Sequence, residues 1–195
     1  MAKKSHKTST PARSKQLRII SGIWRSRIIE FDPVSGLRPT GDRIRETLFN
    51  WLAPHIPGAR CLDLFSGSGA LGFEAISRGA SHCTLVDSNS TVTKKLNEQI
   101  SLLQATNIVV EQRDVLEFLS TSPAKPFDTV FIDPPFALEL LTPTCNLLKN
   151  NQWLSADAFI YCEQSVTDSS FTAPANWQLI RTKTSGDVRY SLYTH

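Results

Sequence analysis

Apolar residues change their spacing along the chain, and the change falls near residue 60. From there on, short apolar runs alternate with segments in which apolar residues recur every three or four positions, the periods of buried strands and of amphipathic helices. The expected strands are 60–65, 82–86, 108–111, 127–132 and 158–162, and the expected helices are 70–78, 90–103, 115–119 and 138–148. Near-continuous apolar strands separated by helices are typical of a parallel sheet covered on both faces. The pattern therefore predicts an α/β fold.

The first 60 residues have a different pattern. Residues 1–16 are basic and carry no acidic residue, which predicts a disordered tail. Two short β-rich runs around a Ser-Gly pair at 21–22 predict a β-hairpin over 17–36, with residues 24–27 in its second arm. Apolar residues on one face then predict a helix over 42–53. We therefore expect a tail and a hairpin extension in front of the α/β domain.

The C-terminal end also departs from the strand–helix alternation. Residues 177–182 and 188–193 flank a Ser-Gly-Asp turn and predict a closing antiparallel hairpin. Added to the parallel strands, this hairpin predicts a mostly parallel seven-stranded sheet with helices on both faces. We expect the resulting domain to cover residues 37–195.

Charge is distributed unevenly between the two parts of the chain. The formal net charge is only +3, but residues 1–60 hold 12 Lys/Arg and 4 Asp/Glu, whereas the later residues hold 9 and 14. A basic front on an acidic body is typical of a protein that meets a polyanion, and a solubilising tail produces the same pattern. No apolar run approaches the roughly 20 residues that span a bilayer, which excludes a membrane-spanning protein.

The cysteines and histidines are scattered. Cys61, Cys83, Cys145 and Cys162 form no C-x-x-C pair, and most lie in apolar, strand-like runs, as expected of buried thiols in a reducing compartment. The four histidines have no ligand spacing. Together with the lack of a secretory signal pattern, these features predict a cytoplasmic protein without a metal site.

A glycine-rich turn joins the first strand of the domain to its first helix. Gly67, Gly69 and Gly72 spell G-x-G-x-x-G, and Asp87 ends the second strand about 20 residues later, as in dinucleotide-binding proteins. An NAD-dependent oxidoreductase is therefore a rival interpretation. Asp63, inside the first strand, argues against it, because a carboxylate there would repel a pyrophosphate. The same carboxylate suits a ligand with an ammonium group, such as S-adenosylmethionine.

Two further acidic residues follow later strands of the expected sheet. If the ligand is S-adenosylmethionine, Asp87 is placed to hold its ribose hydroxyls. Asp114, after the third strand, is placed to accept a hydrogen bond from the adenine amino group, and it is equally consistent with a solvated loop carboxylate. These acids predict a cofactor site at the carboxyl edge of the sheet.

The fourth strand ends in the sequence Asp133-Pro134-Pro135-Phe136. Two prolines cannot extend a strand, so the chain breaks where neighbouring strand ends form the ligand crevice of such sheets. Asp133 and the Pro134 carbonyl can both accept hydrogen bonds from an exocyclic amino group, and Phe136 can stack on a flipped base. A base amino nitrogen is a poor nucleophile because its lone pair is delocalised. Two hydrogen-bond acceptors can direct the lone pair at the methyl carbon and stabilise the ammonium that develops, so the nitrogen becomes a better nucleophile.

The motifs carry a resemblance to a known family. Residues 63–69 with D-P-P-F at 133–136 resemble class I S-adenosylmethionine-dependent methyltransferases that act on an exocyclic amine of a nucleobase. The segments R-I-I-S-G-x-W-R at 18–25, G-L-R-P-T at 36–40 and D-R-x-R-E-T-L-F-N-W-L at 42–52 resemble, more narrowly, the RsmD family of bacterial 16S ribosomal RNA methyltransferases. Ser21 and Ser26 stand where that family more often has glycine. D-P-P-F is shared with adenine-N6 enzymes and indicates the chemistry rather than the base.

The resemblance implies a fold, a reaction and a substrate. The fold is a Rossmann-like class I methyltransferase domain, and the cofactor is S-adenosylmethionine. The reaction is methyl transfer to N2 of a guanine, guanine 966 of 16S ribosomal RNA, within an assembled small-subunit particle. We expect a monomer with no metal and no membrane partner. Adenine-N6 methylation of DNA or RNA is the alternative reaction. A third interpretation is a nucleic-acid-binding module with a vestigial cofactor fold. The intact set of Asp63, Gly67, Gly69 and Asp133 argues against this third interpretation.

The resemblance and the charge pattern together assign roles to residues. The amine-gripping residues are Asp133, Pro134, Pro135 and Phe136, and the cofactor-binding residues are Asp63, Phe65, Gly67, Gly69, Asp87, Asp114 and Thr40. The basic residues expected on the RNA backbone are Lys3, Lys4, Lys7, Arg13, Lys15, Arg18, Arg25 and Arg27. Trp24 either stacks on a base or packs in the hairpin. We expect a functional role for Arg38, whereas Arg43 and Arg45 either reach phosphates or the cofactor or lie on a solvated helix face.

Overall fold

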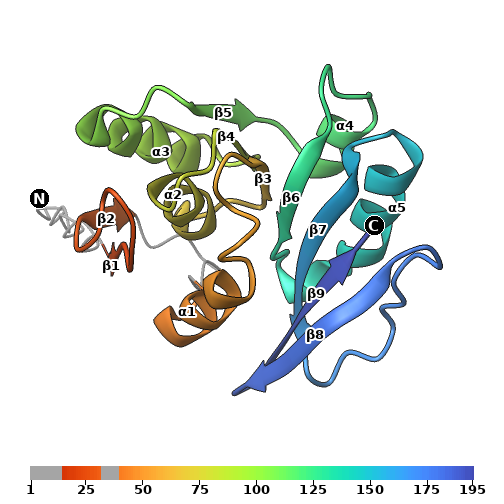
Figure 1. Ribbon diagram of the computed structural model, residues 1–195. Helices are drawn as coiled ribbons and strands as arrows, with labels where there is room; N and C mark the ends of the chain where they lie inside the picture. The colour runs from red at the N-terminus through yellow and green to blue at the C-terminus, as the bar shows by residue number, and fades with distance from the viewer. Residues whose placement is uncertain (1–14, 32–39) are drawn as a thin grey trace, which may run out of the picture.

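The computed structural model describes residues 15–31 and 40–195. The expected tail, with Lys3, Lys4, Lys7 and Arg13, lies almost entirely outside the described residues, and so does Arg38. Figure 1 shows a twisted sheet with helices packed on either side of it and a small two-stranded unit beside α2.

The predicted mostly parallel sheet is confirmed. Within the described residues, seven strands follow the order β5-β4-β3-β6-β7-β9-β8. Their bounds are β3 (Arg60–Leu64), β4 (His82–Asp87), β5 (Ile108–Gln112), β6 (Phe127–Ile132), β7 (Leu154–Ser165), β8 (Gln178–Ser185) and β9 (Val188–Thr194). The first five of these pair in parallel, and β9 is antiparallel to both β7 and β8. Strands β4 and β5 lie on one side of β3, and β6 and β7 lie on the other. This switch in strand order between β3 and β6 creates a crevice at their carboxyl ends.

The helices cover both faces of the sheet, as expected. They are α1 (Asp42–Trp51), α2 (Ala70–Ser77), α3 (Ser90–Leu103), α4 (Val115–Leu119) and α5 (Leu141–Asn150), with a 3₁₀ turn, η1, at Phe136–Leu138. Helices α1, α2 and α3 share one apolar cluster with Cys61 and Phe131, whereas α4 and α5 share the other with Leu62 and Ile132. Neighbouring residues of one strand thus enter opposite cores, as strand pleating requires. All four cysteines are buried and unpaired, as expected.

Several element boundaries differ from the sequence expectation, including those of the helix after β6 and of strand β7. The helix predicted over 138–148 begins at Leu141, because Glu139 adopts a left-handed conformation (φ 49°) that separates it from η1. The strand predicted over 158–162 extends to Ser165, because its pairing with β9 continues to Ser165 opposite Val188. This longer strand carries Glu163 and Gln164 into the sheet.

The N-terminal hairpin is present, with a longer connection than expected. Strand β1 (Lys15–Arg18) pairs antiparallel with β2 (Ile28–Phe31). The expectation that 24–27 form the second arm was wrong, because residues 22–27 form consecutive turns: the Arg25 amide donates to the Gly22 carbonyl, and the Arg27 amide donates to the Trp24 carbonyl. Ser26 has φ 69°, the left-handed conformation that favours glycine.

The connection of the hairpin docks on the C-terminal end of α2. The Ile23 amide donates to the Ser77 carbonyl at 2.8 Å, and the Trp24 amide donates to Ser77 Oγ at 3.0 Å. Trp24 is partly buried against the core that contains α2, so of the two roles weighed for it the structure shows packing. Among the described residues, no helix is both long and apolar enough to cross a membrane.

Arg45 was expected either to reach phosphates or the cofactor or to lie on a solvated helix face, and both expectations were wrong. The side chain is completely buried, with its Nη2 atom 2.6 Å from Asp42 and 2.9 Å from the Arg18 carbonyl. Its Nη1 atom lies 3.6 Å from the buried carboxylate of Glu74, on α2. Arg45 therefore ties α1 to α2 and to the hairpin.

Candidate active site

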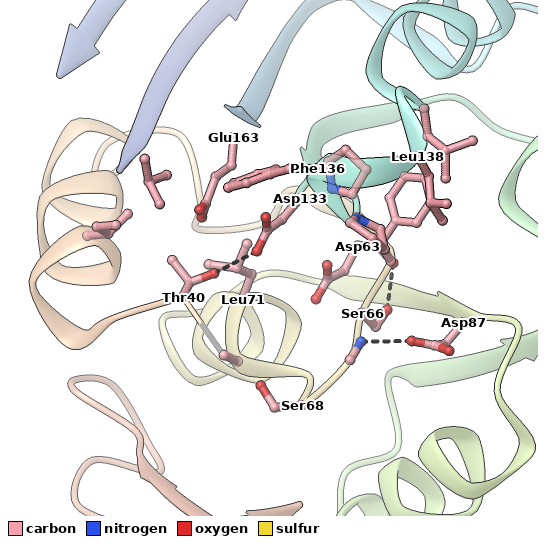
Figure 2. A pocket seen from close by; sticks show the side chains of 18 of the residues that line it. Thr40, Asp63, Ser66, Ser68, Leu71, Asp87, Asp133, Phe136, Leu138 and Glu163 are labelled. Atoms are coloured by element: carbon pink, nitrogen blue, oxygen red, sulfur yellow. Dashed lines mark hydrogen bonds between the residues drawn. The ribbon is translucent and has the colours of Figure 1, made fainter. Parts of the chain in front are cut away.

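A cavity of about 530 Å³ opens at the carboxyl ends of β3, β4, β6 and β7. Figure 2 shows carboxylates from several strands pointing into it. The turn from β3 to α2, the D-P-P-F segment, the start of α1 and the β8–β9 turn supply most of its wall. The crevice predicted at the reversal of strand order is therefore present, and it collects side chains that are far apart in the sequence.

Asp63 lies at the floor of this cavity and is only 3% exposed. Its Oδ2 atom accepts a hydrogen bond from the Gly72 amide at 2.9 Å. Burial raises the pKa of the Asp63 carboxyl from its usual 3.8 to about 8; the Gly72 hydrogen bond lowers the pKa and the charge of Asp87 raises it. A cationic ligand would favour the ionised form of this carboxyl, because opposite charge offsets the cost of burying the anion.

The glycine turn between β3 and α2 is built on left-handed backbone conformations. Phe65, Gly67 and Gly69 all have positive φ, at 62°, 51° and 73°. A Cβ atom on Gly69 would lie 2.5 Å from the ring of Phe73, so this glycine is also required by packing inside the protein. Phe65 and Gly67 form part of the cavity wall, whereas Gly69 is not among the residues that line it.

Asp87 links the second strand to this turn. One carboxylate oxygen accepts from the Gly67 amide at 3.0 Å and the other from the Asn89 amide at 2.9 Å. Burial raises the pKa of Asp87, and these two hydrogen bonds lower it. Asp87 lines the cavity, at the strand end where a ribose-binding carboxylate was expected.

Asp114 also lines the cavity, and its carboxylate caps a helix. The Oδ1 atom accepts from the amides of Leu116 and Glu117, at 2.9 and 3.1 Å, and so begins α4. Neither of the two roles weighed for Asp114 included this one. One carboxylate oxygen fixes the loop at the cavity wall, and contact of the residue with an adenine stays a prediction.

Asp133 follows β6 and faces the cavity from the side opposite Asp87. Thr40 Oγ1 donates to Asp133 Oδ2 at 3.2 Å, which joins the segment before α1 to the D-P-P-F motif. Burial and the neighbouring charge of Glu163 raise the pKa of Asp133 well above its usual range. Phe136 lines the cavity with 41% of its surface exposed, which is the placement expected of a ring that stacks on an incoming base.

Glu163 completes the acidic set, and the sequence analysis missed it. Its side chain is 3% exposed and lines the same cavity, and Tyr161 Oη donates to its Oε1 atom at 2.7 Å. The missed signal was an acidic residue directly after the apolar run 158–162, the same position that Asp133 has after β6. Because the strand was expected to end at 162, Glu163 was given no role.

The basic residues fall into two groups. Arg43 lines the cavity, whereas Arg18, Arg25 and Arg27 are exposed on the hairpin and are not part of its wall. Within residues 15–31 and 40–195, no group of three or more His, Cys, Asp or Glu side chains is placed to hold a metal ion. The site is a cavity with a mostly apolar wall into which several carboxylates project.

Comparisons with known proteins agree with this geometry. A family model described as "Conserved hypothetical protein 95" matches residues 17–194. Ribosomal RNA small subunit methyltransferase D of Escherichia coli (strain K12) is 48% identical over 180 residues, which cover 92% of this chain and 90% of that protein. The enzyme of the same name from Haemophilus influenzae is 43% identical over 190 residues, 96% of this chain and 98% of that one. The solved structure of the E. coli protein yhhF has a TM-score of 0.84 at 49% identity and covers 93% of this chain and 98% of that chain.

Proposed function

The chain belongs to the RsmD family, and we propose that it transfers a methyl group from S-adenosylmethionine to N2 of a guanine in 16S ribosomal RNA. The observation that carries the proposal is the position of Asp133, at the end of β6 beside the strand that bears Asp63 and the glycine turn. An amine-binding motif and a cofactor cradle thus open into one cavity. Guanine 966 is the position that the family resemblance implies.

The methyl donor is S-adenosylmethionine, and the cavity fits it. The ligand carries an ammonium and a sulfonium, and the cavity offers the buried carboxyl of Asp63 and the half-buried carboxyl of Asp87 together with an apolar wall. We assign Asp63 to the ammonium end, Asp87 to the ribose hydroxyls, and Phe65, Gly67, Gly69, Asp114 and Thr40 to the rest of the cradle. When bound, the cofactor supplies an electrophilic methyl group. The carboxylates hold it by charge, which a neutral or anionic dinucleotide would not match.

The D-P-P-F segment prepares the acceptor. Asp133 and the Pro134 carbonyl hold the two hydrogens of the amine, and Phe136 stacks on the base. The nitrogen becomes positively charged as its lone pair forms a bond to the methyl carbon in place of that carbon's bond to sulfur, and the nitrogen then loses one proton. Because burial raises the pKa of Asp133, this carboxyl is a better proton acceptor than an ordinary aspartate, and it can take that proton.

We place the nucleic acid on the basic front of the protein, which is formed by residues 1–60. Arg18, Trp24, Arg25 and Arg27 belong to the hairpin that projects beside α2, and Arg43 lies at the cavity itself. The proposed substrate is the RNA within an assembled small-subunit particle, on which a monomer acts in the cytoplasm. The particle, the monomeric state and the location stay predictions.

The test is transfer of tritiated methyl groups to small-subunit particles and to naked 16S RNA, followed by nucleoside analysis. We expect N2-methylguanosine, with particles as the better substrate, and no labelled product from an Asp133→Ala variant that still binds S-adenosylhomocysteine within a few-fold of wild type. Labelled N6-methyladenosine would contradict the proposal and favour the adenine alternative. Calorimetric titration with S-adenosylhomocysteine and with NAD separates the oxidoreductase interpretation, because binding of NAD alone would refute a methyltransferase.

A further inference from the structure

Glu163 is a buried acid that neither the glycine turn nor the D-P-P-F motif accounts for. We propose that Glu163 selects guanine by accepting the hydrogen bond of its N1–H group, and that Tyr161 positions the Glu163 carboxylate for this contact. The inference rests on the proposed function, since it names how the same site tells guanine from adenine.

The sheet places the two acids side by side. Strands β6 and β7 pair in parallel with Ile132 opposite Cys162, so the next residues in each chain, Asp133 and Glu163, leave neighbouring strand ends on the same side. Both line the cavity, and Figure 2 shows their carboxylates approaching one another. The charge of Glu163 raises the pKa of Asp133, as expected of two acids that share one pocket.

Tyr161 fixes the orientation of Glu163. Its ring is completely buried and its hydroxyl donates to Glu163 Oε1 at 2.7 Å, two residues along the same strand. A carboxylate oxygen can accept more than one hydrogen bond, so this contact orients the group without using all its acceptor capacity. A side chain held in this way is preorganised to receive a donor from a ligand.

Whether such a carboxylate can bind a base depends on the donors and acceptors that lie beside the amino group of that base. The amino group of guanine has the N1–H donor beside it, so a base whose N2 lies at Asp133 presents a further donor toward the neighbouring acid. The amino group of adenine has acceptors on both sides, N1 and N7. An ionised carboxylate cannot donate, so adenine would leave Glu163 buried against another acceptor. Two adjacent acids therefore match guanine and reject adenine.

The experiment uses 2-aminopurine, which keeps the amino group of guanine but has an acceptor in place of N1–H. Small-subunit particles carry either guanine or 2-aminopurine at the methylated position, and kcat/KM is measured for each. We expect wild-type enzyme to prefer guanine by about 100-fold or more, because a site built around a donor rejects analogues that lack it. We expect Glu163→Gln to narrow that preference by about tenfold or more, because its amide can donate to N1 of 2-aminopurine.

Two further variants separate recognition from general damage. Tyr161→Phe should also reduce the preference for guanine over 2-aminopurine, by less than Glu163→Gln does. Loss of packing alone would instead lower kcat/KM for both bases equally. Glu139→Gln removes a negative charge from an exposed position between η1 and α5 and should leave the preference unchanged. 2-Aminopurine also lacks the oxygen at position 6 of guanine, and this difference is the same for every enzyme variant. Only the change between variants in the ratio of kcat/KM for the two bases therefore reports on Glu163.

The outcomes distinguish the inference from its premise. If wild-type enzyme places no methyl group on guanine N2, the proposed function fails and this inference fails with it. If wild-type enzyme methylates guanine N2 but treats 2-aminopurine equally well, the inference alone is overturned, whatever the stability of the variants. An unchanged ratio in a folded Glu163→Gln enzyme would overturn it too.

Discussion

The Oε2 atom of Glu74 lies 3.6 Å from the Nη1 atom of Arg45, and both side chains are completely buried. Glu74 also accepts hydrogen bonds from the amides of Ile20 and Ser21, at 2.8 and 3.0 Å, and from Arg78 Nε at 2.6 Å. One carboxylate of α2 thus joins the hairpin to the helix that follows the glycine turn. The basic front and the cofactor cradle are parts of one packed unit.

Removing this carboxylate should strongly destabilise the protein. We expect Glu74→Ala to lower the free energy of unfolding by about 3–5 kcal/mol, because it takes the buried carboxylate away from the Arg45 guanidinium and leaves the Ile20 and Ser21 amides without their acceptor. Adding Arg45→Met should recover part of the loss, because no unpaired charge then remains in the core. Urea unfolding measures both effects. Glu117→Ala, which breaks the exposed pair with Arg113, is the control and should cost less than about 1 kcal/mol. A double variant no more stable than Glu74→Ala would contradict this explanation.

Gly22 tests how the hairpin docks on α2. It has φ 86°, and a Cβ atom there would overlap the carbonyl oxygen of Ser77. Gly58 has a similar φ of 80° but open space around it, so Gly58→Ala isolates the cost of the backbone conformation, about 1–2 kcal/mol. We expect Gly22→Ala to cost more and to expose the hairpin to limited proteolysis, because the connection must leave α2. Equal unfolding free energies for the two variants would show that the close approach is not required.

The regular elements could be predicted because their signals are local. Helix α3 has the bounds that the sequence predicted, since Asn89 caps its start and Gln104 ends it in a left-handed conformation. Arg45 and Glu163 were not predicted correctly, because their surroundings depend on distant residues. The partner that buries Arg45 is Glu74, 29 positions away, and the pairing that extends β7 to Glu163 comes from β9. Sequence spacing within one element carries no information about either contact.

The site, like the fold, could be predicted where the signal lies in the local sequence. Asp63 was expected from its place inside the first apolar strand, and Asp87 and Asp133 from their places at the ends of later strands; all three line one cavity. Capping of α4 by Asp114 was not expected, because a loop acid before a short helix can face either the backbone or a ligand. The use of each group therefore depends on geometry that the sequence pattern leaves open.

Cofactor binding should depend on pH through Asp63. Because burial raises its pKa to about 8, the carboxyl of the free protein is largely protonated at pH 6, and binding of a cationic ligand must remove the proton. We expect the dissociation constant of S-adenosylhomocysteine, which keeps the ammonium, to rise by close to tenfold for each pH unit below about 7. Calorimetry between pH 5.5 and pH 8.5 measures this slope.

The same pKa has an opposite consequence for stability. The Asp63 pKa is higher in the folded state than its usual value of 3.8, so the free protein should lose stability as pH rises from about 4 to about 8. Asp63→Asn should remove this loss together with the pH dependence of cofactor affinity, and it should bind the cofactor weakly at every pH. A variant that keeps the wild-type pH slope would show that another group controls it.

Arg25 and Arg27 should bind the RNA backbone from the exposed connection of the hairpin. Each phosphate contact releases condensed counterions, so Arg25→Ala and Arg27→Ala should each reduce the slope of log affinity against log salt concentration by about one. Filter binding of 16S RNA at several salt concentrations measures the slope. Lys149→Ala is the matched control, because Lys149 is exposed on α5, which covers the opposite face of the sheet. If the control changes the slope as much as the arginine variants do, the RNA does not bind on the hairpin side, and the basic front would serve solubility alone.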